Sequence, residues 1–202
     1  MGRPKSLLDF DGRTGLSLVM EACVRSLARE TVLVLGAGDT GRERQEAGSG
    51  RPDQPLKVVV NDRFMLGRTS SIKTGLEAIS PGSDGFMIVP VDLPLVRSVD
   101  IDALISRQEA APRGRTIFVA TWEGQRGHPI LFANAHKEHI LELRDDEPLR
   151  DYVRVRQGET EQVPVDNDGV VASMNTPEEY AHVLAAYRDR AVRGRERDGA
   201  AG

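Results

Sequence analysis

Short apolar runs alternate with segments of helical periodicity along most of this chain. Each run is four to six residues long, and runs of that kind are typical of strands that are buried on both faces. Strands that alternate with helices favour an α/β fold, a mostly parallel sheet with helices on both faces. The expected strands are residues 31–35, 57–60, 86–89 and 116–121, with a further short one at 130–132. The expected helices are residues 16–29, 71–79, 99–109 and 136–143, and residues 38–56 are expected to form a loop with at most one helical turn.

The last helix has the clearest start. Thr176 can cap it, Pro177 suits its first turn, and Glu179 completes a capping box. Beyond residue 188 the sequence is charged and rich in glycine, which is typical of disorder. With 202 residues the chain is long enough for one well-buried core. We therefore expect a single domain over residues 1–187 and a disordered charged tail over 188–202.

Composition excludes several classes of partner. The net charge is -4 and the pI is about 5.6, which argues against a nucleic-acid or anionic-membrane surface. The single cysteine, Cys23, allows no intramolecular disulfide and favours a reducing compartment. No stretch reaches the roughly 20 apolar residues of a membrane-spanning helix. We expect a cytoplasmic protein.

Polar residues follow the expected strands where ligands usually bind. In parallel sheets ligands gather beyond the carboxyl ends of strands, which singles out Gly36, Asn61 and Asp92. Asp92 is followed by Leu93 and Pro94, and a carboxylate there is suited to a hard cation such as Mg²⁺. An aspartate that caps a turn explains the same position equally well.

Four other segments carry polar groups with both functional and structural explanations. Asn175 precedes the last helix, where its amide oxygen is available to a metal or is simply part of a loop. Gly67 and the serines at 70 and 71 lie at a helix start, where they suit either a close ligand or a cap. A plain turn explains Gly127 and Pro129 but does not explain why Arg126 and His128 are both present. Arg3 and Lys5 are basic residues near the N-terminus, where solvated charge is the simpler explanation.

Together and in order, these segments resemble the MobA-like nucleotidyltransferases, most closely their molybdenum cofactor cytidylyltransferase branch. The resemblance extends over residues 1 to about 187. Its motifs are Met-Gly-Arg-Pro-Lys-Ser at the start, residues 61–67 with Ser71-Ile72 and Gly75-Leu76, Val91-Asp92-Leu93-Pro94, Arg126-Gly127-His128-Pro129, and Asn175-Thr176-Pro177-Glu178-Glu179. The fourth and fifth are the more specific ones.

The resemblance implies a Rossmann-like nucleotidyltransferase fold and a defined reaction. A nucleoside monophosphate, CMP for this branch, would pass from a nucleoside triphosphate to a phosphorylated small-molecule acceptor with release of pyrophosphate. Molybdopterin is the acceptor of the nearest branch, and a molybdoenzyme or its maturation factor would then be a protein partner. By carry-over, Asp92 and Asn175 hold Mg²⁺, and Lys5, Asp92 and His128 are catalytic, with His128 facing the acceptor. The nucleotide-binding residues implied are Arg3, Lys5, Asn61, Gly67 and Ser71.

The sequence departs from the family pattern at three places. The family has a strand and a glycine-containing loop before Met-Gly, whereas this sequence begins at Met1. The loop supplies amides that cradle phosphates, so this form is expected to bind nucleotide weakly and to turn over slowly. A start codon placed too late is the explanation we favour. Val91 replaces a glycine, and residues 145–150 differ from the branch's Gly-Asp-x-Gly-Ala-Arg pattern, which leaves the acceptor open.

Two competing hypotheses remain. Residues 36–41 read Gly-Ala-Gly-Asp-Thr-Gly, a dinucleotide fingerprint directly after a strand, and Asp62 lies near the position expected for its acidic partner. That would make the protein an NAD or FAD binder. Residues 42–56, however, lack the apolar stripe of the long helix that this fold requires. The second alternative is a non-catalytic nucleotide-binding relative.

Overall fold

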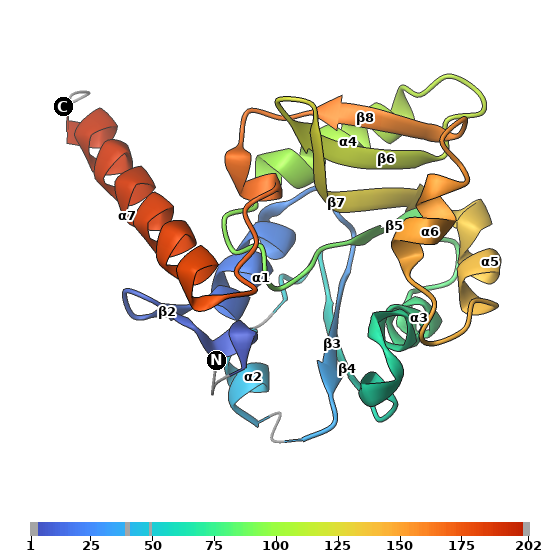
Figure 1. The fold of residues 1–202 in the computed structure, drawn as a ribbon, viewed down its shortest axis with the longest axis horizontal. Helices are drawn as coiled ribbons and strands as arrows, with labels where there is room; N and C mark the ends of the chain where they lie inside the picture. Colours follow the sequence, from blue (N-terminus) through green and yellow to red (C-terminus); the bar gives the residue numbers. More distant parts are fainter. Residues whose placement is uncertain (1–3, 39–40, 49, 200–202) are drawn as a thin grey trace.

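The computed structural model describes residues 4–38, 41–48 and 50–199. Figure 1 shows the arrangement of its elements. The strands are β1 (Asp9–Phe10), β2 (Arg13–Thr14), β3 (Thr31–Gly36), β4 (Leu56–Asn61), β5 (Gly85–Ile88), β6 (Ile117–Trp122), β7 (Gln125–Ala133) and β8 (Thr160–Pro164). The α-helices are α1 (Gly15–Arg25), α2 (Gly41–Glu46), α3 (Arg68–Ala78), α4 (Ser98–Glu109), α5 (Lys137–Leu141), α6 (Leu149–Arg154) and α7 (Pro177–Gly199). Short 3-10 turns are η1 (Lys5–Leu7), η2 (Phe64–Leu66), η3 (Asn134–His136) and η4 (Asp168–Val170).

The strands form a mixed arrangement, so the expected α/β class is confirmed and the expected mostly parallel sheet is corrected. β3 and β4 pair in parallel, from Thr31 opposite Leu56 to Gly36 opposite Asn61. A second sheet has the order β5-β7-β6-β8, in which β6 and β8 are parallel and β7 is antiparallel to both of its neighbours.

A tight hairpin is the reason for the reversed strand. Glu123 and Gly124 separate β6 from β7, and both have positive φ angles, of 47° and 81°. Two residues with positive φ form the turn whose twist suits a β-hairpin. β7 is therefore a nine-residue strand, whereas the short apolar run alone predicts only residues 130–132.

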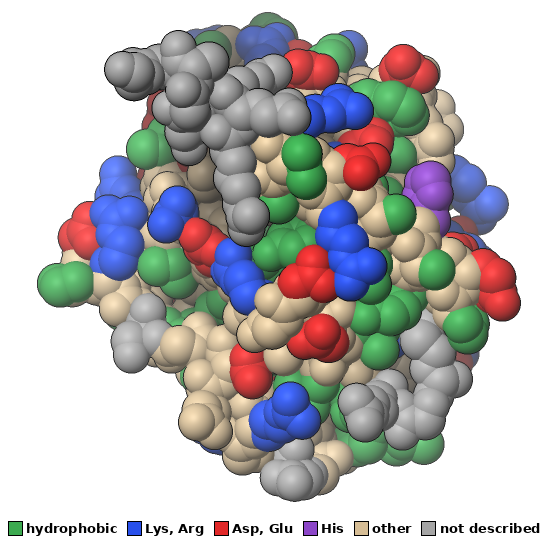
Figure 2. Space-filling view, turned by 90° about the vertical axis from the view of Figure 1, so that its left-hand side faces the viewer, with side chains coloured by type: hydrophobic (Ala, Val, Ile, Leu, Met, Phe, Trp, Pro, Cys, Tyr) green, Lys and Arg blue, Asp and Glu red, His purple; other side chains and the backbone are tan. Residues whose placement is uncertain are grey.

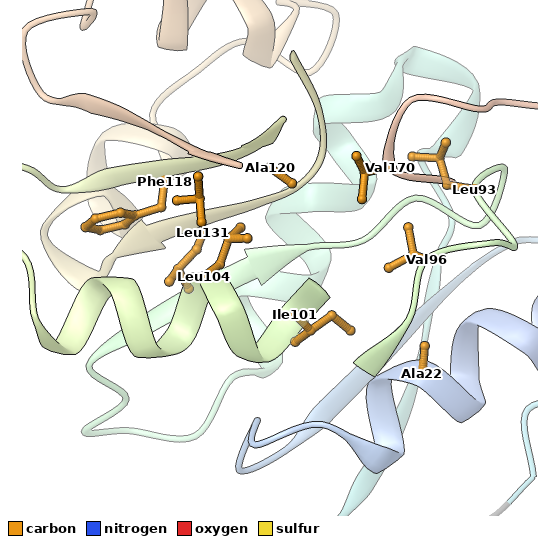
Figure 3. Close-up of a cluster of buried hydrophobic side chains, with 10 residues drawn as sticks. Ala22, Leu93, Val96, Ile101, Leu104, Phe118, Ala120, Leu131 and Val170 are labelled. Atoms are coloured by element: carbon orange, nitrogen blue, oxygen red, sulfur yellow. The ribbon is translucent and has the colours of Figure 1, made fainter. Parts of the chain in front are cut away.

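The main core lies between the mixed sheet and the helices that cover it. Figure 3 shows side chains from α1, α4, β6 and β7 meeting in one cluster, together with Leu93 and Val96 from the loop after β5. Leu104, Phe118, Ala120 and Val170 are fully buried in it. This cluster anchors the segment that begins beyond β5, which is where the candidate site lies. A second cluster packs α3, α5 and α6 against β5, β6 and β7.

The last helix begins as the capping pattern predicts and extends further than the composition predicts. The Thr176 hydroxyl accepts a hydrogen bond from the Glu179 amide at 3.2 Å, and the Glu179 carboxylate accepts one from the Thr176 amide at 3.2 Å. α7 then continues to Gly199, through most of the segment expected to be disordered (Figure 1). Ion pairs of Arg188 with Asp11 and of Arg190 with Asp168 tie this part of α7 to the body of the protein.

The surface has no large field of one charge on the face that Figure 2 shows. Acidic and basic side chains are interspersed there, among the residues the structure describes, which agrees with the small net charge. Within the described ranges no helix is both long enough and apolar enough to cross a bilayer.

Candidate functional site

Asp92 lies on a turn just beyond the carboxyl end of β5. The strand ends at Ile88, one residue earlier than expected, and its chain continues through Pro90 into the turn. The Asp92 carbonyl accepts a hydrogen bond from the Met174 amide at 3.1 Å. This backbone contact joins two segments that are more than 80 residues apart in the sequence. It brings Asn175, the neighbour of Met174, beside the Asp92 turn.

A small cavity of about 240 Å³ opens at this junction. Segments from four parts of the chain form its wall, and most of the polar side chains facing it were candidates from the sequence. The polar residues that line the cavity are Arg68, Asp92, Arg126, His128, Ser173 and Asn175. A larger and more open depression of about 460 Å³ lies along α5 and α6, and none of the motif residues lines it. We therefore take the smaller cavity, called the Asp92 pocket below, as the candidate site.

His128 enters the Asp92 pocket from the first half of β7. Burial lowers the pKa of His128 below 6.5, and the Arg68 charge acts in the same direction. The Asp92 charge and a backbone hydrogen bond with Ile88 oppose that shift of the pKa. The Nδ1 atom of His128 is buried and has no hydrogen-bond partner in the described part of the chain. A buried ring nitrogen without a partner costs free energy, which is typical of a group that meets a ligand.

Gly127 explains how the His128 segment comes so close to the far wall of the pocket. A Cβ atom at this position would lie 2.0 Å from the Val170 carbonyl oxygen. Only glycine allows the two backbones to approach this closely. Glycine at 127 is thus a packing requirement, and the cis peptide between His128 and Pro129 lies directly after it.

The N-terminal turn η1 lies against the other side of the pocket. The Lys5 ammonium donates a hydrogen bond to the Asn175 Oδ1 at 2.7 Å, and the Asn175 amide nitrogen Nδ2 donates one to the Ser173 hydroxyl at 2.8 Å. Lys5 therefore stands one hydrogen bond from the pocket wall. Arg3, the other basic residue implied at the N-terminus, lies outside the described residues.

The donor set at the pocket suits a divalent metal bound partly by substrate. Asp92 offers a carboxylate, and Asn175 offers an amide oxygen once the Lys5 ammonium that now donates to it moves away. Mg²⁺ commonly takes one or two protein oxygens plus phosphate and water. No group of three or more His, Cys, Asp or Glu side chains that could hold a metal occurs among the residues that the structure describes. A metal here would accordingly depend on phosphate oxygens to complete its coordination.

In the crossover from β4 to α3, Arg68 lines the Asp92 pocket, whereas Asn61, Gly67 and Ser71 do not. The Asn61 side chain is buried; it donates to the hydroxyls of Ser70 and Ser71 at 2.8 and 2.9 Å. Its Oδ1 accepts a hydrogen bond from the Arg63 amide at 2.9 Å. Gly67 has a φ of 139°, and a Cβ there would lie 2.7 Å from the Asp145 carbonyl oxygen. The close approach at Gly67 is thus to the protein's own backbone.

Two charged residues near this junction, Arg68 and Asp145, were not among the candidate site residues predicted from the sequence. Arg68, the first residue of α3, places its guanidinium 3.6 Å from the Asp92 carboxylate. Asp145, whose backbone packs against Gly67, is paired with Lys73 at 3.0 Å and with Arg63 at 3.2 Å. Both Lys73 and Asp145 are largely buried. The departure of residues 145–150 from the family pattern was the one signal in the sequence that pointed to this segment.

The dinucleotide hypothesis finds no support in the segment after β3. Residues 39 and 40 of the fingerprint lie outside the described residues. The helix that follows, α2, has six residues and buries none of them. A dinucleotide fold needs a long helix packed on the sheet at this position.

Comparison with known proteins places the chain in a family. The family of MobA-like NTP transferase domains matches residues 1–163, so the chain belongs to that family. It is a nucleotidyltransferase enzyme. No curated protein matches the sequence.

Solved structures with the same fold share little sequence with the chain. Rv0371c from Mycobacterium tuberculosis H37Rv, solved as a manganese complex, has a TM-score of 0.72 and 21% identity, and the match covers 91% of this chain and 93% of that one. A nucleotidyl transferase from Methanothermobacter thermautotroptrophicus has a TM-score of 0.73 and 20% identity, with 92% and 86% covered. A CMP:2-keto-3-deoxy-manno-octonic acid synthetase complexed with CTP has a TM-score of 0.69 and 13% identity, with 92% of each chain covered.

Proposed function

We propose that this enzyme transfers CMP from CTP to the phosphate group of a small-molecule acceptor, releasing pyrophosphate, and that the acceptor is a molybdopterin. The observation that carries the proposal is the Asp92 pocket, where Asp92, His128 and Asn175 come together from three distant segments of the chain. Each belongs to a motif that resembles the molybdenum cofactor cytidylyltransferase branch. A solved structure of similar fold holds CTP, which supports cytidine as the base.

The reaction is a substitution at phosphorus. An oxygen of the acceptor phosphate forms a bond to the α-phosphorus of the triphosphate, and the bond from that phosphorus to the β-phosphate oxygen breaks. Pyrophosphate leaves with the electron pair. The reacting groups are all anionic, so the protein contributes chiefly by positioning them and neutralising their charge.

The residues of the pocket have separate roles in this proposal. Asp92 and Asn175 would hold a Mg²⁺ ion, which neutralises phosphate charge when it is bound. Lys5, one hydrogen bond from Asn175, would contact the triphosphate. His128 would face the acceptor, because it lines the Asp92 pocket from β7, whereas Lys5 contacts Asn175 from the N-terminal turn. Its lowered pKa keeps the imidazole neutral at pH 7.

The crossover residues are proposed to act on the nucleotide side. Ser71 is half-buried at the start of α3, and Asn61 and Gly67 fix the backbone around it. The Asn61 side chain is occupied by internal hydrogen bonds. It would therefore contribute to nucleotide binding indirectly, by holding Ser71 in place.

The test is pyrophosphate release measured with each of the four nucleoside triphosphates, with and without a molybdopterin-type acceptor. We expect release that requires the acceptor and has the highest kcat/KM with CTP. A higher kcat/KM with GTP would assign a different base. Absence of release with all four triphosphates would contradict the transfer itself.

A matched pair of variants connects the activity to the pocket. Asp92→Asn removes the charge beyond the carboxyl end of β5, and Asp84→Asn makes the same change just before the strand's first residue, at an exposed site. We expect the first variant to lose pyrophosphate release and the second to retain it. Equal activity in the two variants would show that Asp92 has no part in the reaction.

A further inference from the structure

Arg68 is anchored at its backbone and free at its side-chain end. Gly67 before it packs against the Asp145 backbone, and the Thr69 hydroxyl after it donates a hydrogen bond to the Glu147 carbonyl at 2.5 Å. The Arg68 side chain itself is 83% exposed. Its guanidinium therefore starts from a fixed point but can rotate over the pocket.

The contact with Asp92 is the one ion pair that Arg68 makes within the described part of the chain. It joins the Arg68 Nη2 and the Asp92 Oδ2 at 3.6 Å, too long for a strong hydrogen bond. The Asp92 end of the pair is largely buried, but the guanidinium end is exposed to water, which screens the attraction, so the pair contributes little free energy. Arg68 thus covers the carboxylate without being firmly held by it.

A divalent metal and Arg68 compete for the Asp92 carboxylate. The metal needs a carboxylate oxygen at about 2.1 Å, and its two positive charges would repel a guanidinium a few ångströms away. Phosphate oxygens relieve the repulsion, since they bind a metal and a guanidinium at the same time. The planar guanidinium is also suited to two parallel hydrogen bonds with a phosphate. Arg126 supplies a second guanidinium to the same pocket.

We propose that Arg68 is a phosphate-binding residue of the Asp92 pocket that pairs with Asp92 in the free enzyme and moves to a substrate phosphoryl group when a metal takes the carboxylate. The inference rests on the proposed function, because it takes a phosphoryl group as the ligand and Asp92 as a metal ligand. The phosphoryl group belongs either to the nucleoside triphosphate or to the acceptor. The position therefore has two opposite effects, hindering metal binding in the free enzyme and favouring phosphate binding in the complex.

The first measurement is Mn²⁺ binding to the substrate-free enzyme by electron paramagnetic resonance. Arg68→Gln should bind Mn²⁺ about twofold to fivefold more tightly than the wild type, because a weak competing ion pair is gone. Arg126→Gln removes the same charge from the same pocket without an ion pair to Asp92, and it should change the affinity less. Arg113→Gln is the distant control: Arg113 is exposed in the turn before β6, a strand that runs parallel to β5, so it lies at the opposite end of the sheet from Asp92.

The second measurement determines which phosphate Arg68 receives. The Kd for CTP, from calorimetry with Mn²⁺ present, reports on the triphosphate. The KM for the acceptor at saturating CTP reports on the acceptor phosphate. Arg68→Gln should weaken one of the two about tenfold or more, the usual cost of losing a hydrogen bond to a charged group, and Arg68→Lys should recover part of it.

The two measurements allow the role of Arg68 to fail independently of the proposed cytidylyl transfer. Unchanged Mn²⁺ affinity in Arg68→Gln, or a change no larger than that in Arg126→Gln, would overturn the pairing with Asp92. Unchanged CTP and acceptor constants would overturn the phosphate role. Mn²⁺ binding needs no turnover, so the pairing can be decided even if no pyrophosphate is released with any triphosphate.

Discussion

Two polar regions near strand ends contain similar kinds of side chain and differ in whether those side chains have partners. At the β4–α3 crossover, the Asn61 side chain uses both its nitrogen and its oxygen in buried hydrogen bonds to its own chain. In the Asp92 pocket, among the residues that the structure describes, a buried nitrogen of His128 has no partner, and the Asp92 carboxylate makes one long ion pair, with Arg68. Buried polar groups in proteins are almost always paired. The two regions therefore differ in whether their polar side chains already have partners, a property that residue type alone does not indicate.

The glycines in the two regions make the same point. Gly67 admits the Asp145 backbone, and Gly127 admits the Val170 backbone. Both glycines serve packing between distant segments. A glycine that suggests close approach to a ligand can equally mark close approach to the protein itself.

The largest expected effect is that of Asp92→Asn on catalysis. The variant keeps the shape of the side chain and removes its charge, so pyrophosphate release should fall on the order of 1000-fold, as when a preorganised charge-stabilising group is lost. Stability should change by less than about 1 kcal/mol, because the Asp92 backbone carbonyl still accepts the Met174 hydrogen bond. Steady-state kinetics and urea unfolding measure the two quantities. A large loss of stability with little loss of rate would reverse the comparison between the two regions.

Asn61→Ala should show the converse pattern. The substitution removes a hydrogen bond from each of the Ser70 and Ser71 hydroxyls and from the Arg63 amide. The Ser70 hydroxyl keeps its hydrogen bonds to the Arg63 and Gly67 carbonyls. The substitution should therefore cost about 2 kcal/mol of unfolding free energy. For a chain of this size that corresponds to a melting temperature lower by roughly 4–8 °C. Calorimetry gives the melting temperature, and kcat/KM below it should fall less than tenfold. Loss of CTP binding with an unchanged melting temperature would place Asn61 in direct contact with nucleotide.

The smallest expected effect concerns two histidines. Burial lowers the pKa of His128 and of His136 below the 6.5 of a free imidazole. The unfolded chain then binds more protons than the folded one just below pH 6.5, so stability should fall as the pH drops from 6.5 towards the folded pKa values. Urea unfolding at several pH values tests this, and His128→Gln or His136→Gln should reduce the slope.

Added phosphate should distinguish the two rings. Both ring nitrogens of His136 already have partners, the Tyr152 and Thr116 hydroxyls, each at 2.8 Å. His128 faces the pocket, and a bound anion would favour its charged form. Titration followed by nuclear magnetic resonance should therefore show inorganic phosphate raising the pKa of His128 alone. Equal shifts for both rings would indicate a nonspecific salt effect.

Local patterns predicted the elements well where the signal was local. The apolar runs of β3, β4 and β5 and the capping box at Thr176 and Glu179 are read from neighbouring residues, and the structure contains them within a residue or two. The sequence patterns did not predict β8 and α6. Both segments are polar, and the elements that they pair with or pack against are distant in the sequence. The direction of β7 depends on the two-residue turn at Glu123 and Gly124, where both φ angles are positive. A Glu-Gly pair in the sequence does not by itself predict such a turn.

What the sequence determined by itself is therefore the class of fold, the family motifs and the identity of the polar residues near strand ends. Those follow from side-chain chemistry and short-range periodicity. Only the tertiary structure decided that Asn61 is used internally, that His128 lines the same pocket as Asp92 and Asn175, and that Arg68 pairs with the Asp92 carboxylate. The reason is that hydrogen-bond satisfaction and charge pairing depend on which distant segments meet, and no pattern along the chain contains that information.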